Sequence, residues 1–198
     1  YPVPYYIEGG QVYLNSAMNC DGTPLGEAVY SNSKTSDIPP HEYEDGVCMN
    51  CGHIQDDYAD CDEEGYYLLD NGSKLYWFSM QVNVNKHADW NAKLTENIDM
   101  GSYEDLFMPI GSYAEGATYR GTFDGQGHII SNLRINSSYN YTGFIGQAGN
   151  GLVVKNLLLD ETCSLSGGEC CALVGGANQM SGTVTLQNLG NMGNVYSS

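Results

Sequence analysis

Three stretches of the chain resemble one another: Gly127-His-Ile-Ile-Ser-Asn-Leu-Arg-Ile135, Gly151-Leu-Val-Val-Lys-Asn-Leu-Leu-Leu159 and Gly182-Thr-Val-Thr-Leu-Gln-Asn-Leu189. Each places a glycine before a run rich in β-branched or aliphatic residues, and each contains the pair Asn-Leu. A second pair of similar segments, 142–148 and 171–177, is separated by 29 residues. Repeats of this period, each too short to bury its own apolar face, indicate a stacked array of coils.

The asparagine of each stretch is predicted to lie at a corner of a coil. In a parallel solenoid, short strands alternate with Gly-rich corners, and an Asn amide at an inside bend bonds to the coils above and below it. We therefore expect Asn132, Asn156 and Asn188 to stack as a ladder. Their spacing is irregular, 24 and then 32 residues. This irregularity leaves open an antiparallel sandwich in which Asn-Leu ends three ordinary strands.

Several ordered motifs resemble the GLUG-motif β-helix proteins of bacterial cell surfaces. They are Ala92-Lys-Leu-Thr-Glu-Asn-Ile-Asp-Met100, Pro109-Ile-Gly111, Tyr119-Arg-Gly-Thr-Phe-Asp-Gly-Gln-Gly-His-Ile-Ile-Ser-Asn-Leu133 and Gly143-Phe-Ile-Gly146. The resemblance runs from about Ser73 to the end of the chain. It implies a right-handed parallel solenoid with a helix ahead of its first coil, in an adhesin-like module of a surface protein. Gly175-Gly176 and Cys170-Cys171 depart from the pattern in the later coil.

The predicted fold is all-β: a right-handed parallel β-helix from about Lys93 onward, preceded by a capping helix and an irregular Cys-rich module. Apolar residues on one helical face predict the helix at about Ser73 to Asn83, with Ser73 as its N-cap. A boundary near Gly65 separates a module at 1–65 from the helix and solenoid at 66–198. Residues 188–198 look like the start of another coil, so we expect a longer parent protein and a final coil with an under-protected apolar edge.

The charge balance excludes two classes of partner. The chain has 24 acidic and 7 basic residues, a net charge of -17, whereas binding to nucleic acid or to anionic lipid depends on Lys and Arg. No window approaches the roughly 18 consecutive apolar residues of a membrane helix, so we expect no membrane insertion. Few basic residues together with 16 Tyr and 25 Gly are typical of exported proteins, which favours a secreted or cell-surface location.

The sequence Cys48-Met-Asn-Cys51-Gly52 has the two-residue spacing of a zinc knuckle. Cys20 and His41 are the predicted remaining ligands, because the run from His41 to Cys48 resembles a short Cys/His element found ahead of surface repeats. His53 and Cys61 are reserve ligands. A closed Cys3His set would hold a structural Zn²⁺ with no open position for water. Disulfides among Cys20, Cys48, Cys51 and Cys61 are the alternative, since an exported protein favours them.

Two other groups of polar residues are weaker candidates for chemistry. The acidic run from Asp56 to Glu64 offers hard oxygen ligands for calcium but lacks the EF-hand spacing, so a solvated acidic loop is favoured. Asp124 and His128 invite comparison with polysaccharide-active β-helix enzymes, yet Asp124 lies in a Gly-rich turn as a structural residue. We therefore expect no catalytic residues.

Together these observations favour a non-enzymatic binding or scaffolding module of a secreted or cell-surface bacterial protein. Its surface ligand is expected to be a glycan or a protein. The alternative is a polysaccharide-active enzyme of the pectate-lyase-like β-helix type, which needs clustered carboxylates in a concave groove.

Overall fold

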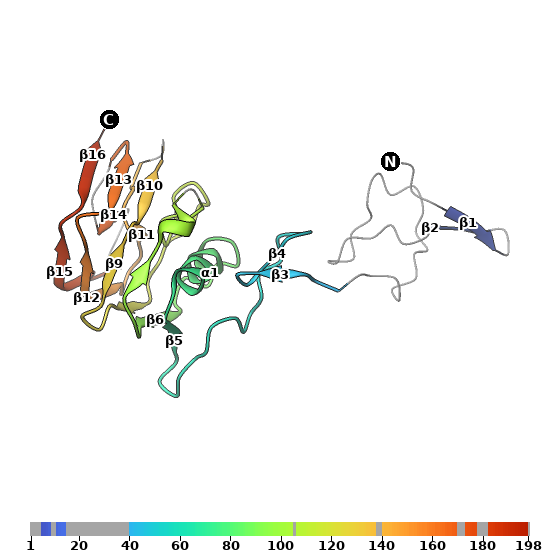
Figure 1. Cartoon of the computed structure of the whole chain (residues 1–198), viewed down its shortest axis with the longest axis horizontal. Helices are drawn as coiled ribbons and strands as arrows, with labels where there is room; N and C mark the ends of the chain where they lie inside the picture. The colour runs from blue at the N-terminus through green and yellow to red at the C-terminus, as the bar shows by residue number, and fades with distance from the viewer. Residues whose placement is uncertain are drawn as a thin grey trace. The chain divides into compact units, whose positions relative to one another are not determined.

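The chain folds, in a computed structural model, as two units, Tyr1–Gln55 and Asp56–Ser198 (Figure 1). The structure describes residues 5–8, 11–14, 40–104, 106–137, 140–169, 173–177 and 182–197. The predicted zinc ligand Cys20 and the Cys170-Cys171 pair lie outside these residues. The boundary expected near Gly65 lies ten residues beyond the division between the two units.

The first unit contains two short antiparallel strand pairs in its described part. One joins β1 (Tyr5–Glu8) to β2 (Gln11–Leu14), and the other joins β3 (Tyr43–Glu44) to β4 (Val47–Cys48). Pairs of this size are marginal as isolated structures in water. The expectation of an irregular Cys-rich module at 1–65 stays a prediction, because much of this unit lies outside the described residues.

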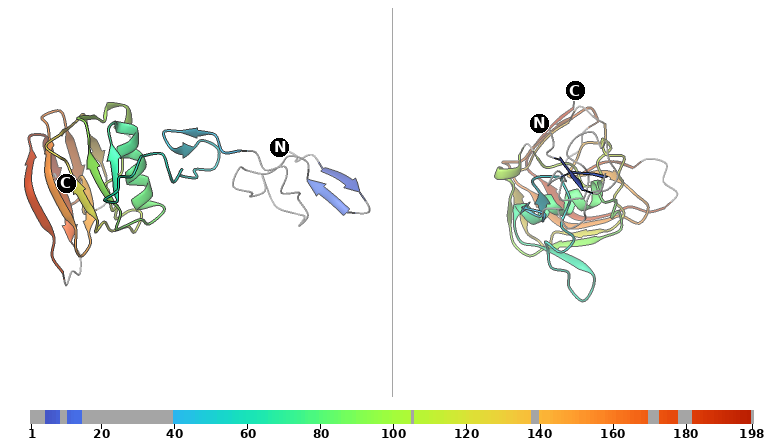
Figure 2. Two further views of the ribbon diagram at one scale, coloured as in Figure 1. Left: turned by 90° about the horizontal axis from the view of Figure 1, so that it is seen from below. Right: turned by 90° about the vertical axis from the view of Figure 1, so that its right-hand side faces the viewer.

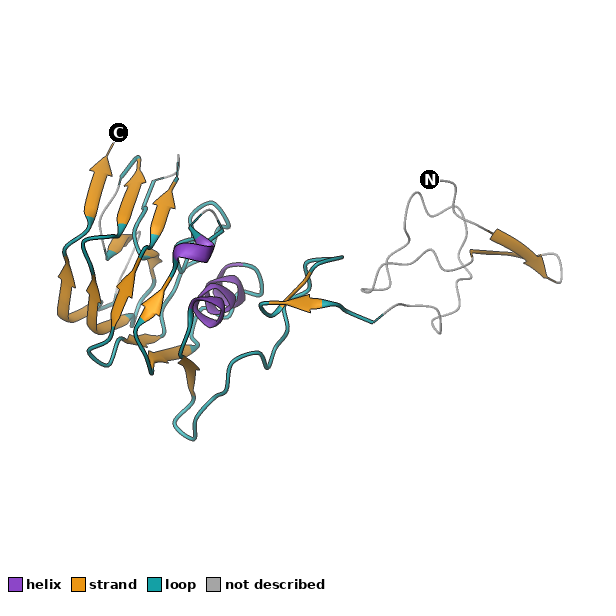
Figure 3. Cartoon of the chain, viewed as in Figure 1, coloured by secondary structure: helices purple, strands orange, loops and turns teal. Residues whose placement is uncertain are grey.

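The second unit is a parallel β-solenoid of about three turns, as the repeats predict (Figure 3). The pairs formed by the strands of its described part are all parallel. Its strands are β5 (Tyr66–Leu69), β6 (Asn91–Leu94), β7 (Ile98–Asp99), β8 (Thr122–Asp124), β9 (Ile129–Ser131), β10 (Arg134–Asn136), β11 (Ile145–Ala148), β12 (Val153–Leu159), β13 (Ser164–Gly167), β14 (Val174–Ala177), β15 (Thr185–Asn191) and β16 (Asn194–Ser197).

The strands stack in register from coil to coil. Val154 of β12 aligns with Phe123 of β8 on one side and with Leu186 of β15 on the other. Within the similar segments 142–148 and 171–177, strands β11 and β14 pair, so 145–148 and 174–177 occupy corresponding places in adjacent coils. The repeat pattern therefore identified true structural equivalents here.

The apolar side chains of the coils meet in one core, which α1 (Gly72–Asn83) covers at one end of the stack (Figure 2). Trp77 and Phe78 of the helix are fully buried, and the Phe78 ring packs edge-on against Phe123 and Tyr119. The helix joins β5 to β6, and these two strands are themselves paired. The parallel sheet thus begins one strand earlier than the sequence predicted, and the helix lies in its first crossover.

Asn71, and not Ser73, caps the start of α1. The Asn71 side-chain oxygen accepts a hydrogen bond from the Lys74 N–H at 2.9 Å, and the backbone of Asn71 is extended. The predicted cap Ser73 is wrong because its hydroxyl instead donates to the Asn71 side chain and contacts the Tyr58 hydroxyl. Both residue types favour N-caps, so composition alone does not choose between them.

The end of α1 fixes the loop that follows β7. The buried Asn83 side chain accepts hydrogen bonds from the N–H groups of Gly111 and Ser112 and donates one to the Pro109 carbonyl. A second donation, to the Ser79 hydroxyl, completes its hydrogen bonding. One buried amide thus holds the 109–112 segment against the helix.

The predicted asparagine ladder is correct for two members and wrong for the third. The Asn188 amide donates to the Asn156 side-chain oxygen at 3.0 Å, and the Asn156 amide donates to Asp124 at 3.0 Å, each across 32 residues. Asn132 lies at the next corner, where its amide donates to Asp99. All three asparagines have positive φ, between 52° and 55°, so both corners need a residue that tolerates the left-handed conformation.

The last described coil exposes apolar side chains. Leu186 is 52 % exposed, although Val154, its partner in the preceding coil, is fully buried. Met192, Val195 and Tyr196 are also exposed.

Replacing Asn156 tests the corner. Asn156→Gly keeps the backbone conformation but removes two side-chain hydrogen bonds, one of them to a carboxylate, so we expect it to lower the free energy of unfolding by about 2 kcal/mol. Asn156→Ala adds the cost of a left-handed residue with a Cβ, about 1 kcal/mol more. Denaturant titration followed by circular dichroism measures both values.

Asn132→Gly is the matched control, because this residue has the same φ and donates one side-chain bond to Asp99. We expect a loss of about 1 kcal/mol there. Equal losses for Asn156→Gly and Asn156→Ala would show that the backbone conformation is not a constraint at this corner.

Candidate functional site

A tight hairpin brings the predicted metal ligands of the first unit together. The strands β3 and β4 are joined by Asp45 and Gly46, whose φ values of 51° and 77° are both positive. Such a two-residue turn matches the twist of the paired strands, and Asp-Gly is among its preferred sequences. The register sets Tyr43 of β3 opposite Cys48 of β4, and His41 lies two residues before Tyr43, toward the end of the hairpin that carries Cys48.

A second turn returns the chain toward the hairpin. Cys48 accepts a backbone hydrogen bond from Gly52, and its own N–H donates to the His53 carbonyl. Gly52 has a φ of 74°, which a residue with a side chain adopts only with strain. Cys51 lies within this turn and is thereby directed toward His41.

The three side chains form a cluster with the geometry of metal ligands. One ligand atom from each of His41, Cys48 and Cys51 lies within 4.8 Å of the others. The distance from His41 Nδ1 to Cys51 Sγ is 3.4 Å. Zn–S and Zn–N bonds of about 2.3 and 2.0 Å in a tetrahedron place a sulfur and a nitrogen ligand about 3.5 Å apart, so the spacing of His41 Nδ1 and Cys51 Sγ matches that of two ligands of one zinc ion. Cys48 is buried, as suits a structural site.

His53 and Tyr43 extend this cluster. The His53 ring stacks on His41 with 4.5 Å between ring centroids, and its Nδ1 lies 2.9 Å from the Tyr43 hydroxyl. Tyr43 faces Cys48 across the hairpin. The sequence analysis assigned Tyr43 no role. Its place opposite Cys48 depends on the register of the hairpin, and in the sequence this register is indicated by the Asp45-Gly46 turn alone.

The other candidate ligands are placed differently. Cys20 lies outside the described residues. Cys61 belongs to the second unit, where it bridges to Tyr67 and its Sγ contacts the Asp62 carbonyl. His41, Cys48 and Cys51 are therefore the predicted ligands that the described structure brings together.

The acidic run is used in part for local structure. The Asp62 carboxylate accepts hydrogen bonds from the N–H groups of Glu64 and Tyr66 and pairs with Lys93. The hydrogen bond from Lys93, followed by that from Tyr66, holds the pKa of Asp62 below its usual value. Among the described residues, no group in this run has the arrangement of a metal site.

Asp124 is surrounded by donors at the first corner. It accepts hydrogen bonds from the N–H and side-chain amide of Gln126 and from the Asn156 amide, and it pairs with Lys155 at 3.0 Å. Burial raises the pKa of Asp124, but the hydrogen bonds from Asn156, Gln126 and Lys155 together bring it below its ordinary value. This carboxylate is 4 % exposed, which agrees with a structural role.

Cys163 is a buried thiol of the core. Its Sγ lies 3.3 Å from the Ile130 carbonyl of the preceding coil. Burial raises the pKa of this thiol, which disfavours the reactive thiolate.

Comparison of the chain with protein-family models, with curated protein sequences and with solved structures finds no match. Among the described residues, no helix has both the length and the apolar character needed to cross a membrane.

The lowered pKa of Asp124 makes stability depend on pH. A carboxylate whose pKa is lower in the folded than in the unfolded state, about 3.9 for Asp, stabilises the fold fully above that value. Its contribution is lost as the pH falls through the folded pKa. Asp62 and Asp99, whose pKa values are also lowered, act in the same direction. We therefore expect the urea midpoint to fall below about pH 4.

Asp124→Asn should lower the midpoint at neutral pH and reduce the further loss on acidification, because the neutral amide has no proton to gain. Asp89→Asn is the control, since this carboxylate is exposed and its ion pair with Arg120 is long, at 3.9 Å. An Asp124→Asn variant with the full acid sensitivity of the wild type would contradict the assignment.

Proposed function

We propose that the chain is a non-enzymatic binding or scaffolding module of a secreted or cell-surface bacterial protein. The observation that carries this proposal is the use of the solenoid's polar side chains to hold coil to coil. Asp124, Asn156 and Asn188 bond to one another across the stack. Parallel coils add length at about 4.8 Å each, so such an array is suited to projecting or presenting a surface.

The motif behind the GLUG resemblance has a physical explanation at this corner. A Cβ on Gly125 would lie 2.3 Å from the Asn156 carbonyl, and Gln126 and Gly127 both have positive φ. The run Asp124-Gly-Gln-Gly127 therefore combines close coil contact with a left-handed turn. The geometry explains the motif as part of the fold, and an adhesin-like role at the cell surface is our proposal from the resemblance of the motif.

The arrangement around Asp124 disfavours the polysaccharide-active enzyme. Hydrolysis of a glycosidic bond requires two carboxyl groups flanking it, about 5 to 9.5 Å apart. Asp124 already accepts hydrogen bonds from Gln126 and Asn156 and faces Lys155. A carboxylate so engaged is a poor proton donor, because its pKa is lowered.

A polysaccharide-cleavage screen of the purified chain tests the functional class. We expect no turnover of pectate, alginate, xylan or chitin, measured as reducing ends and as unsaturated products. Turnover that Asp124→Asn abolishes without unfolding the protein would overturn the proposal in favour of the enzyme.

We further propose that the cluster of the first unit holds one structural Zn²⁺ through His41, Cys48 and Cys51, with Cys20 as the fourth ligand. Thiolates and a histidine in a segment with little regular structure suit this ion. The stacked His53 is the competing fourth ligand.

Metal analysis and cobalt substitution test the zinc proposal. We expect one zinc per chain, lost in Cys48→Ser, and a thiolate-to-cobalt charge-transfer band whose intensity falls by about one third in Cys20→Ser, as removal of one of three thiolates requires. His53→Ala is the matched variant and should leave the band unchanged. A band altered by His53→Ala and not by Cys20→Ser would assign the fourth position to His53. Disulfides found by mass spectrometry between these cysteines would end the proposal.

A further inference from the structure

Strand β10 is the edge strand of its sheet. The order of that sheet is β10, β13, β16, so β10 pairs with β13 on one side only. In the preceding coil the corresponding segment contains a 3-10 helix, η2 (Gly101–Tyr103), followed by an irregular loop. The other edge of β10 is therefore left without a strand partner in the described structure.

The hydrogen bonds to β13 fix which backbone groups this edge presents. Ser164 N–H donates to the Leu133 carbonyl, and Ser137 N–H donates to the Ser166 carbonyl. Alternate residues of a parallel strand bond to opposite neighbours. Leu133, Ile135 and Ser137 thus bond toward β13, and the N–H and C=O groups of Arg134 and Asn136 point to the unpaired side.

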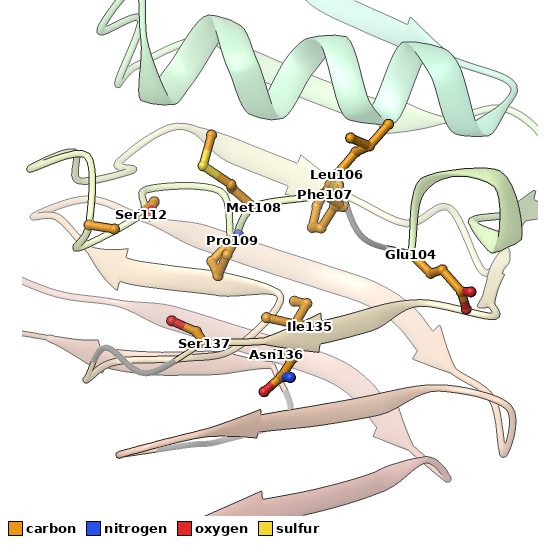
Figure 4. A pocket seen from close by; sticks show the side chains of 10 residues that line it. Glu104, Leu106, Phe107, Met108, Pro109, Ser112, Ile135, Asn136 and Ser137 are labelled. Atoms are coloured by element: carbon orange, nitrogen blue, oxygen red, sulfur yellow. The ribbon is translucent and has the colours of Figure 1, made fainter.

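A groove of about 370 Å³ runs beside this edge (Figure 4). Apolar side chains from the loop before β8 and from β10 form much of its lining, with Glu104 at one end. Leu106 is 55 % exposed, whereas Phe107 packs against Phe144 and is 5 % exposed. The loop that contributes Pro109 and Ser112 is held by the Asn83 amide. This part of the groove wall is thus anchored to α1.

We propose that this groove binds an extended peptide segment, which adds a strand to the free edge of β10. The proposal deepens the binding-module function and rests on it. Unpaired strand groups next to a partly apolar groove are the two features of β-strand addition: the main-chain bonds provide affinity, and the groove takes alternate side chains. The peptide places one apolar side chain against Leu106 and Ile135.

Charge selects the class of peptide. The chain carries a net charge of -17, and Glu104 is the charged residue among those that line the groove. Arg134, outside that lining, pairs with Glu104 at 2.9 Å. The field of the protein therefore attracts a basic peptide and repels an acidic one. A glycan fits less well, because the Arg134 and Asn136 backbone groups repeat at the spacing of a strand.

Amide hydrogen exchange measured by NMR tests the proposal on the whole chain. The probe is an acetylated and amidated heptapeptide with Val-Ile-Val at its centre and lysine at both ends. At about ten times its Kd, exchange of the Arg134 and Asn136 amides should slow about tenfold. The Ile135 amide, which already bonds toward β13, should not change.

Matched reagents separate strand addition from other binding. The same peptide N-methylated on its central residues should not protect either amide, and a version with glutamate ends should bind more weakly. Leu106→Asp should weaken binding, whereas Met192→Asp, at a side chain with similar exposure (58 %) outside the residues that line the groove, should not. Binding that leaves the Arg134 and Asn136 amides unprotected, or protection by an oligosaccharide alone, would overturn the inference. Neither result bears on the cleavage screen, so this failure is distinct from failure of the proposed function.

Discussion

The structure of the second unit depends on one constraint that every coil repeats. At each corner the chain must change direction, and the polar backbone groups there must find hydrogen-bond partners in the neighbouring coil. Asp124, Asn156 and Asn188 satisfy this constraint at a corner between two walls of the solenoid. Asn156 has a left-handed backbone and divides β12 into halves that pair with β8 and with β9. The register of both walls follows from this residue, since a shift by one position would turn the apolar side chains outward.

The sequence predicted the stacked fold because the apolar pattern and the glycines repeat with the coils. The sequence pattern did not show that Asn132 lies at a different corner of the coil from Asn156 and Asn188. Asn132 and Asn156 share the motif Asn-Leu and the same backbone conformation, so the motif itself does not distinguish them. Only the partners in the neighbouring coils differ, Asp99 for one and Asp124 for the other. Such partners become known once the strand register is known.

The metal cluster shows a similar limit. The sequence was enough to predict His41, Cys48 and Cys51 as one group. The two turns that bring them together have local sequence signals, Asp45-Gly46 and Gly52. The stacking of His53 on His41 depends instead on how the second turn returns to the hairpin. The N-cap of α1 is comparable, since Asn71 and Ser73 are both suitable cap residues and the position at which the helix begins decides between them. For both the metal cluster and the N-cap, the sequence indicated the right residue types, but which of them contact one another depends on the three-dimensional structure.

The parallel stacking also determines how the solenoid carries mechanical load. Tension across the stack is borne by the covalent backbone of each coil, which is far stronger than any hydrogen bond. Tension along the stack is borne by the bonds between coils, among them the side-chain bonds from Asn188 to Asn156 and from Asn156 to Asp124. Coils at an end can separate one at a time, because each contacts only its neighbour. A surface built this way yields to force in steps and re-forms coil by coil when the force is removed.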